Sequence, residues 1–269
     1  MRVNVARVWD DADYMKVRSM CDNSQGWREV YKKKGYQCLF AVSPVQQLPD
    51  GQDTYCSFQA VAKFPDVLPS VAYDVLHDSS YRSHWDRHMA SQCFIGIINP
   101  NNDMGYYALS AIPPVRGRDF VMQRSWLDTG DEKLICGHSV YHQVNSNIFV
   151  PLRNPRASET ILRNRVNVHG MLKFTVLFVG TLPPWLVNYL TRVVAPKVVK
   201  KLHKACLSYT QWKQNNQPNF KPWIYPEQQA EYPRVDLTKC EPQEYEQEII
   251  DESNKSPVST IINDEDEDD

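Results

Sequence analysis

Glycine is scarce in this chain, and the motifs that bind nucleotides or present a nucleophile are missing. Only ten of the 269 residues are glycine, and none forms a G-x-G-x-x-G or Walker motif. No G-x-S-x-G segment is present either. The seven cysteines stand at least 17 positions apart, without a C-x-x-C pair, which excludes the familiar zinc spacings. Two histidine pairs, His84 with His88 and His138 with His142, lack a third ligand at metal-site spacing. We therefore expect no enzyme activity, no cofactor and no metal.

Long apolar segments are also absent. No run of 18 apolar residues could span a bilayer, and residues 1–13 turn acidic early, without the apolar core of a signal peptide. The cysteines are odd in number and scattered through core-like segments, which predicts reduced, buried thiols. These features predict a cytoplasmic protein.

The formal net charge of −2 hides a strong asymmetry. Residues 241–269 hold twelve acidic residues and one lysine, a net of −11, whereas residues 1–240 hold 29 basic and 20 acidic residues, a net of +9. A basic body is attracted to anionic surfaces, either lipid headgroups or nucleic acid. Nucleic acid is the weaker alternative, because the lysines gather on one helix face without interleaved aromatic residues for base stacking.

Alternating apolar and polar residues predict a strand-rich body, clearest over residues 54–64. Further strands are expected at 27–31, 36–42, 93–98, 104–110, 119–127, 133–142, 160–168 and 171–179. Turns are expected at 99–103, 113–117 and 128–131. With a short helix at 10–21 and another inserted at 67–76, this order predicts an α+β fold built on a curved antiparallel sheet.

Residues 183–212 have the pattern of one long amphipathic helix, about 45 Å in length at 1.5 Å per residue. One face carries the apolar residues Val198, Val199, Leu202, Ala205, Cys206 and Tyr209, and the opposite face carries Lys197, Lys200, Lys201 and Lys204. Pro196 predicts a kink. Two interpretations remain open: an ordinary core helix, or a helix that also lines a cavity and touches membranes through its lysines.

The composition divides the chain into three parts. Residues 1–215 are expected to form one domain. Residues 216–240, rich in proline and aromatic residues, are expected to wrap that domain as an extended strap. Residues 241–269 are expected to be a disordered acidic tail. We expect a monomer.

The run Tyr81-Arg82-Ser83-His84-Trp85-Asp86 carries the candidate binding residues. It follows a helix whose apolar positions, among them Leu68 and Leu76, recur at helical spacing. If that helix continues for one more turn, Arg82 and Asp86 share a face. A fixed cation and anion beside aromatic rings suit a zwitterion, because a phosphate pairs with arginine and a quaternary amine lies over rings. The alternative is an ordinary helical ion pair on the surface.

Several blocks together resemble the START family of lipid-transfer domains, in particular its phosphatidylcholine-transfer branch. The resemblance covers residues 10–142 and 181–228, and residues 149–180 depart from the pattern. The blocks are Tyr73-Asp74-Val75-Leu76-His77-Asp78, Tyr81-Arg82, Trp85-Asp86, Gly105-Tyr106-Tyr107, Arg118-Asp119, Ser125-Trp126-Leu127, Ala195-Pro196-Lys197, Trp212-Lys213-Gln214 and Phe220-Lys221-Pro222-Trp223.

The resemblance implies the helix-grip fold, in which a curved sheet wraps a long C-terminal helix around an internal lipid cavity. It also implies that Arg82 contacts the lipid phosphate and that Asp86 supports Arg82. Tyr107 and Phe120 occupy two positions of the aromatic cage that holds choline in the phosphatidylcholine-binding relatives. A third aromatic residue of the cage is expected within 149–180.

The implied function is intracellular binding of a glycerophospholipid, phosphatidylcholine and/or phosphatidylethanolamine, and its transfer between membranes by non-covalent exchange. The partners are then the phospholipid ligand and, transiently, an anionic membrane surface that attracts the lysine face. A lipid-responsive sensor or scaffold that transfers no lipid is the alternative.

Overall fold

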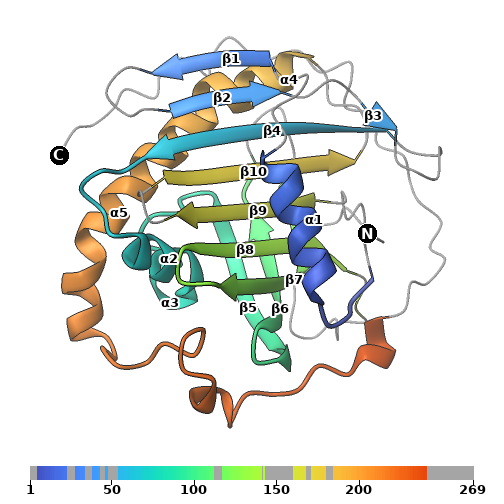
Figure 1. Ribbon diagram of the computed structural model, residues 1–269, viewed down its shortest axis with the longest axis vertical. Coiled ribbons are helices and arrows are strands. Elements are labelled where there is room, and N and C mark those ends of the chain that lie inside the picture. Colours follow the sequence, from blue (N-terminus) through green and yellow to red (C-terminus); the bar gives the residue numbers. More distant parts are fainter. Residues whose placement is uncertain are drawn as a thin grey trace.

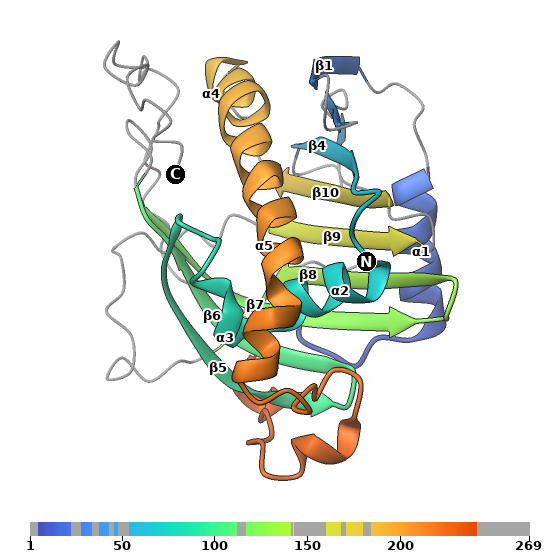
Figure 2. The same ribbon diagram turned by 90° about the vertical axis from the view of Figure 1, so that its left-hand side faces the viewer.

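The computed structural model describes residues 5–22, 28–33, 38–42, 46–47, 54–111, 117–140, 142, 160–167, 171–179 and 184–240, to which the structural statements below refer. These residues contain one antiparallel sheet of ten strands in the order β1-β2-β4-β10-β9-β8-β7-β6-β5, with β3 paired to β4. The sheet curves around the C-terminal helix (Figure 1, Figure 2). This arrangement confirms the predicted α+β fold.

Nine of the ten strands lie where the sequence predicted them, with their ends shifted by a few residues, whereas the short β3 was not predicted. They are β1 Arg28–Lys33, β2 Cys38–Val42, β3 Gln46–Gln47, β4 Thr54–Lys63, β5 Met89–Asn99, β6 Asn102–Leu109, β7 Arg118–Asp128, β8 Glu132–Ser139, β9 Thr160–Asn167 and β10 Met171–Val179. The turn predicted at 99–103 is shorter than expected, because Asn102 and Asp103 already pair with Ser125 and Arg124 of β7. Most of the turn predicted at 113–117 lies outside the described residues.

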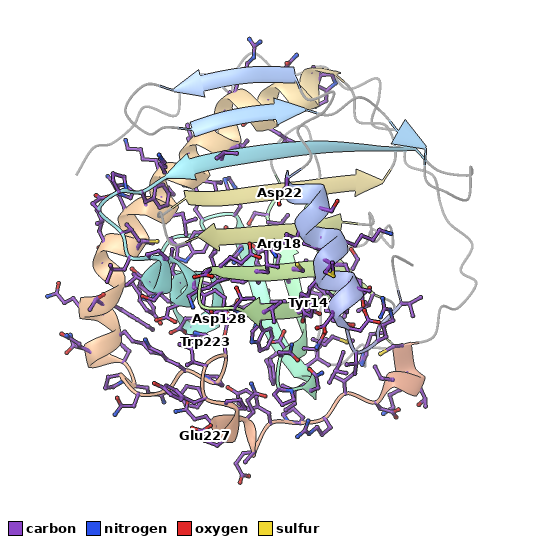
Figure 3. All side chains as sticks on the ribbon, in the orientation of Figure 1. Tyr14, Arg18, Asp22, Asp128, Trp223 and Glu227 are labelled. Atoms are coloured by element: carbon purple, nitrogen blue, oxygen red, sulfur yellow. The ribbon has the colours of Figure 1, made fainter. Side chains whose placement is uncertain are left out.

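The first helix, α1 (Asp11–Asp22), packs on the convex face of the sheet (Figure 1, Figure 2). Trp9, Tyr14 and Val17 form a buried cluster there with Cys136 of β8. The Tyr14 hydroxyl donates to the Trp126 carbonyl oxygen at 3.1 Å, and Arg18 pairs with Glu132 at 2.9 Å; Figure 3 labels Tyr14 and Arg18. The helix covers the outside of the sheet and leaves the concave face to the other helices.

The inserted helix is broken in two. The first part, α2 (Pro69–His77), begins at Pro69, and Leu68 before it is 69% exposed, so the prediction that Leu68 belongs to the buried face was wrong. Leu68 is the extended N-cap residue. The second part, α3 (Ser79–Arg82), ends at Arg82, so the helix does not continue through Asp86 as expected. The Asp86 amide nevertheless donates to the Arg82 carbonyl oxygen at 3.0 Å, which keeps these two residues one turn apart.

The C-terminal helix runs from Pro184 to Asn215 in three parts: α4 (Pro184–Tyr189), the π-helical η1 (Leu190–Val194) and α5 (Ala195–Asn215). The irregularity predicted at Pro196 is a π-helical turn just ahead of it, in which the Ala195 amide donates to the Leu190 carbonyl oxygen. Proline has no N–H and clashes with the carbonyl group four residues earlier, so a wider turn accommodates it. The predicted apolar stripe is confirmed, since five of its six residues, all except Val198, are buried.

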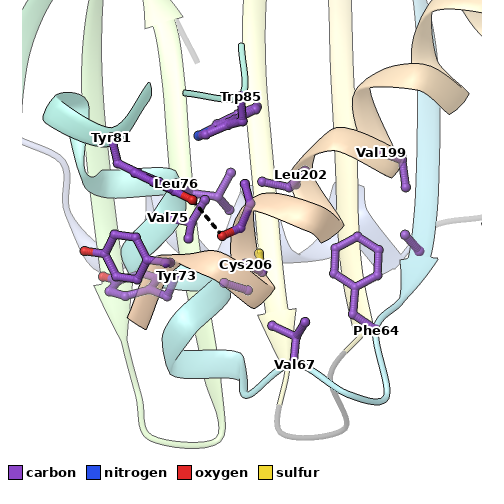
Figure 4. Close-up of a cluster of buried hydrophobic side chains, with 14 of the residues drawn as sticks. Phe64, Val67, Tyr73, Val75, Leu76, Tyr81, Trp85, Val199, Leu202 and Cys206 are labelled. Atoms are coloured by element: carbon purple, nitrogen blue, oxygen red, sulfur yellow. Dashed lines mark hydrogen bonds between the residues drawn. The ribbon is translucent and has the colours of Figure 1, made fainter. Parts of the chain in front are cut away.

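The main core lies between the concave face of the sheet, α2 and α5. Figure 4 shows Phe64, Tyr73, Leu202 and Cys206 within it, and Trp126 of β7 belongs to the same cluster. Each fully buried large apolar side chain stabilises the fold by about 1.5–3 kcal/mol. This packing fixes α2 against α5, and thereby the short segment that follows α2.

Residues 216–240 pack on the end of the domain that is at the bottom of Figure 2, and they contain two short helical turns, η2 (Pro226–Gln229) and η3 (Leu237–Cys240). Ile97 of the edge strand β5 exchanges backbone hydrogen bonds of 2.9 and 3.0 Å with Pro233 and Val235. A Cβ at Gly96 would lie 2.6 Å from the Pro233 carbonyl oxygen, so only glycine allows this close approach. The segment thus covers part of the sheet edge. The division at residues 215 and 240 stays a prediction, and residues 241–269 lie outside the described residues.

Candidate functional site

Arg82, Asp86 and Tyr107 form one connected group at the exit of α3. Arg82 Nε donates to Oδ2 of Asp86 at 2.8 Å, and the Tyr107 hydroxyl donates to the same oxygen at 2.6 Å. The guanidinium carbon of Arg82 lies 4.5 Å from the ring centroid of Trp85 and 5.3 Å from that of Tyr107. The Arg82 side chain is 27% exposed and that of Asp86 11%, so this is a partly buried ion pair flanked by two aromatic rings.

Asp78 holds the short helix that presents Arg82. Its amide donates to the Asp74 carbonyl oxygen at 2.8 Å, which closes α2, and its Oδ1 accepts from the Ser80 amide at 3.1 Å as the N-cap of α3. Its other oxygen accepts from the Tyr209 hydroxyl at 2.9 Å and from Lys213 Nζ at 2.8 Å, both on α5. The buried Asp78 therefore ends one helix through its amide, and through its carboxylate it caps the next helix and ties it to the C-terminal helix.

Tyr81, the residue before Arg82, makes a further contact with α5. The Tyr81 hydroxyl donates to the Ala205 carbonyl oxygen at 3.1 Å, the bond drawn in Figure 4. Together with Asp78, this bond leaves α3 little freedom relative to α5. The position of the Arg82 guanidinium is thus set by residues of both α3 and α5.

A cavity of about 260 Å³ opens beside Arg82 between α2, α3 and the concave face of β5–β8. Arg82, Tyr107, Met122 and Ile135 are among the residues that line it, whereas Asp86 and Phe120 do not. Phe120 is the cross-strand partner of Tyr107, so both side chains lie on the same face of the sheet. The structure therefore brings three of the expected site residues into contact and places the buried Phe120 beside Tyr107.

A second ion pair in this cavity was not predicted from the sequence. Arg124 donates through Nε to Oδ1 of Asp103 at 2.9 Å and through a terminal nitrogen to Oδ2 at 2.5 Å, and it also donates to the His77 carbonyl oxygen at 3.3 Å. Its position carried a signal, since Phe120, Met122 and Trp126 alternate on the inward face of β7 and Arg124 interrupts that apolar row. A charge at an inward position requires a buried partner or a ligand.

Burial sets the protonation of the neutral groups around the cavity. It raises the pKa of Tyr107, with Arg82 opposing and Asp86 adding to the shift, so Tyr107 stays a neutral donor. Burial also lowers the pKa of His77 well below its usual range, with Arg124 and Lys133 adding to the effect. The ring of His77 is neutral, and its Nε2 has no hydrogen-bond partner within the described structure. The cavity thus offers two arginines, each paired with one carboxylate, and neutral polar groups between them.

Other candidate chemistry finds little support among the described residues. They contain no group of three or more histidine, cysteine or acidic side chains placed to hold a metal ion. His84 stacks on Tyr81 at 5.0 Å, and His138 stacks on Trp9 at 5.6 Å. Cys93, Cys136, Cys206 and Cys240, the cysteines whose side chains the structure describes, are free thiols. No helix in the described ranges has both the length and the apolar character needed to cross a bilayer.

Comparisons with known proteins agree with this architecture. The chain is 33% identical over 255 residues to mouse (Mus musculus) START domain-containing protein 10, covering 92% of this chain and 84% of the relative. It is 23% identical over 179 residues to rat (Rattus norvegicus) phosphatidylcholine transfer protein, covering 61% and 79% of the two chains. The crystal structure of human STARD10 superposes with a TM-score of 0.69 at 31% identity, over 87% of this chain and 94% of that one.

A more distant structure shares the fold alone. Human StAR-related lipid transfer protein 5 matches with a TM-score of 0.55 at 15% identity, over 74% of this chain and 95% of that one. The START domain model matches residues 7–150, and its match ends where the sequence begins to depart from the family pattern. These similarities confirm the predicted helix-grip fold, and the chain belongs to the START domain family.

Proposed function

We propose that the protein binds one glycerophospholipid, phosphatidylcholine and/or phosphatidylethanolamine, and transfers it between membranes by non-covalent exchange. The observation that carries the proposal is the Arg82 guanidinium, held by Asp86 at 2.8 Å and lining a cavity on the concave face. Its membership of a lipid-transfer family, with a relative named phosphatidylcholine transfer protein, supports this choice of ligand.

The energetics explain why such a lipid needs a carrier. A diacyl lipid carries about 30 methylenes, and their exposure to water costs roughly 25 kcal/mol at about 0.8 kcal/mol each. Spontaneous passage through water is therefore negligible. A carrier offers an equivalent apolar environment and opens at a membrane, so no covalent step is required. We assign the headgroup to the cavity beside Arg82, called the headgroup cavity from here on, and the acyl chains to the concave face beyond it, towards β9, β10 and β4.

The lipid phosphate is the demanding part of the ligand, because a buried charge must be paired and hydrogen-bonded. A guanidinium has five N–H donors, and Asp86 contacts Arg82 through Nε. The terminal nitrogens suit a phosphate diester, because such a group accepts two parallel hydrogen bonds from an arginine. Asp86 fixes the orientation of the guanidinium, and the rings of Trp85 and Tyr107 both lie within cation–π distance of it.

The headgroup amine lies, in this proposal, against the rings of Tyr107 and Phe120. A choline ammonium is attracted to the face of an aromatic ring by roughly 0.5–2 kcal/mol. The third aromatic residue expected within 149–180 lies outside the described side chains. Two described rings accept choline or ethanolamine, which is why we propose both headgroups.

Exchange requires contact with a bilayer. We assign this contact to the lysine face of α5, where Lys197 and Lys204 are exposed and Lys200 and Lys201 are half-buried. A basic residue near an anionic surface contributes about 1 kcal/mol to binding. With the net charge of +9 over residues 1–240, this surface suits transient docking on the cytoplasmic side of membranes.

The test is the identity and the turnover of the bound lipid. The protein is purified from cells, its lipid is identified by mass spectrometry, and the same preparation is assayed for transfer between vesicles. We expect one glycerophospholipid per protein and measurable transfer. Stoichiometric phospholipid without transfer would favour a sensor or scaffold, and absence of phospholipid would contradict the proposal.

A further inference from the structure

A second, smaller cavity lies next to the headgroup cavity, and we call it the basic pocket. Its volume is about 60 Å³, and its charged lining consists of Asp86, Arg87, His88, Lys197 and Lys201. These residues come from the turn after α3 and from the first turns of α5. Asp86 lines the basic pocket, whereas Arg82 and Tyr107, to which it is bonded, line the headgroup cavity. Asp86 therefore stands between the two.

The charges of the basic pocket do not balance. Asp86 is its one carboxylate, and the Oδ2 atom of that group already accepts from Arg82 and Tyr107. Within the described ranges no carboxylate forms an ion pair with Arg87, Lys197 or Lys201. Three cations thus share a small concavity that lacks a counter-ion of its own.

The titration of these groups reflects this crowding. Burial lowers the pKa of Lys201, and the nearby Arg87 and Lys197 lower it further, with Asp86 opposing. Burial likewise lowers the pKa of His88, with Asp86 opposing the shift and Arg87, Lys201 and Lys197 adding to it. Both groups are thus disfavoured in their charged forms, as expected near uncompensated positive charge. An anion bound in the pocket would favour the charged forms of Lys201 and His88 and so raise their pKa values.

The size and the apolar lining of the basic pocket narrow the choice of anion. A single water needs about 15 Å³, so about 60 Å³ holds roughly four waters or one tetrahedral oxyanion. The apolar part of the lining includes Trp85, Val194, Val198 and the exposed Val193. A doubly charged phosphate monoester matches the excess of cations, and the apolar lining accommodates the carbon atoms attached to it.

We propose that the basic pocket binds a phosphate monoester group through Arg87, Lys197 and Lys201. The group can belong to a soluble metabolite or to a lipid headgroup in a membrane, and the chemistry that recognises it is the same. The site is separate from the phosphate contact assigned to Arg82. Only its membrane form relies on the docking proposed for the lysine face.

Two binding measurements separate the possible sources. The first titrates the full-length protein with glycerol 3-phosphate by calorimetry. The second measures flotation with phosphatidylcholine vesicles that contain either phosphatidic acid, a phosphate monoester, or phosphatidylserine, a phosphate diester, at matched surface charge. We expect binding of the monoester in at least one measurement and a preference for phosphatidic acid over phosphatidylserine wherever vesicles bind. Binding in solution alone identifies a metabolite site, and binding to vesicles alone identifies a headgroup site; either supports the proposal.

Matched variants keep the inference specific. Lys201→Gln is expected to weaken monoester binding about tenfold, the effect of losing one strong charge-assisted contact. Lys204→Gln removes the same charge from the exposed face of the same helix, outside the pocket, and is expected to change binding less than twofold. Equal losses in both variants, or no monoester binding in either measurement, would overturn the proposal. The calorimetric titration involves no phospholipid transfer, so its outcome is independent of the proposed function.

Discussion

The Tyr107 hydroxyl donates a hydrogen bond of 2.6 Å to Oδ2 of Asp86, the same oxygen that Arg82 contacts at 2.8 Å. The family resemblance assigned Tyr107 to an aromatic cage for the headgroup. The structure gives its hydroxyl group a further task, because it holds the carboxylate that orients Arg82. The proposed phosphate contact and the proposed amine contact are therefore joined in one unit.

Tyr107→Phe tests the hydroxyl and leaves the ring in place. Because the acceptor is a carboxylate that is mostly buried, we expect the free energy of unfolding to fall by about 1–2 kcal/mol. Urea denaturation measures it, with Tyr225→Phe, on an exposed tyrosine, as the control expected to change it by less than about 0.5 kcal/mol. Equal stability of Tyr107→Phe and wild type would show that the hydroxyl does not stabilise Asp86.

The buried pair of Asp78 and Lys213, at 2.8 Å, ties α3 to the end of α5. Lys213→Met leaves the Asp78 carboxylate buried without a counter-ion, and we expect a loss of about 3–5 kcal/mol in the free energy of unfolding. Adding Asp78→Asn removes the uncompensated charge and is expected to restore part of the loss. A double variant no more stable than Lys213→Met would contradict this reading of the pair.

The free energy of unfolding is expected to decrease as the pH is lowered, in part because of His138. Burial lowers the pKa of His138 from 6.5 to about 4, and its Nε2 lies 3.3 Å from the Val5 carbonyl oxygen. His138 binds a proton more readily in the unfolded chain than in the folded protein. Its contribution to stability is therefore fully present above pH 6.5 and is lost as the pH falls towards about 4. We expect a loss of about 2–3 kcal/mol from this group.

The check compares wild type with His138→Gln in urea titrations at pH 7 and at pH 4.5. The variant lacks the titrating ring, so its stability is expected to decline less over this interval. His77, also buried with a lowered pKa, contributes to the decline in both proteins and cancels in the comparison. Identical declines would rule out His138 as the source.

Much of the fold could be predicted from the chain because the signals were local. The alternation within β4 and the apolar stripe of α5 each depend on residues a few positions apart. The break at Asp78 was missed because it depends on tertiary partners: Tyr209 and Lys213 lie 131 and 135 positions away along the chain. The π-helical turn replaced a simple kink for a similar reason, since the packing around Pro196 decides how the helix absorbs the missing N–H.

The candidate site shows the same division. The contact between Arg82 and Asp86 followed from their spacing of four, although the helix expected to carry them ends at Arg82. The pair of Arg124 with Asp103 depends on the register of β6 against β7. That register is set by the hairpin and cannot be predicted from a local sequence pattern. The basic pocket likewise could not be predicted from the sequence, because its residues come from a turn after α3 and from a helix more than a hundred residues later.

The most direct test of the proposed phosphate contact is the transfer of labelled phosphatidylcholine between vesicles by Arg82→Gln. This variant removes one of the two arginine cations that line the headgroup cavity, and Arg234→Gln, on an exposed arginine of the C-terminal segment, is the matched control. We expect transfer by Arg82→Gln to fall at least about tenfold, the effect of losing a charge-assisted phosphate contact, while circular dichroism shows that the variant is folded and the control transfers lipid at close to the wild-type rate. Transfer at the wild-type rate by a folded Arg82→Gln protein would contradict the assignment.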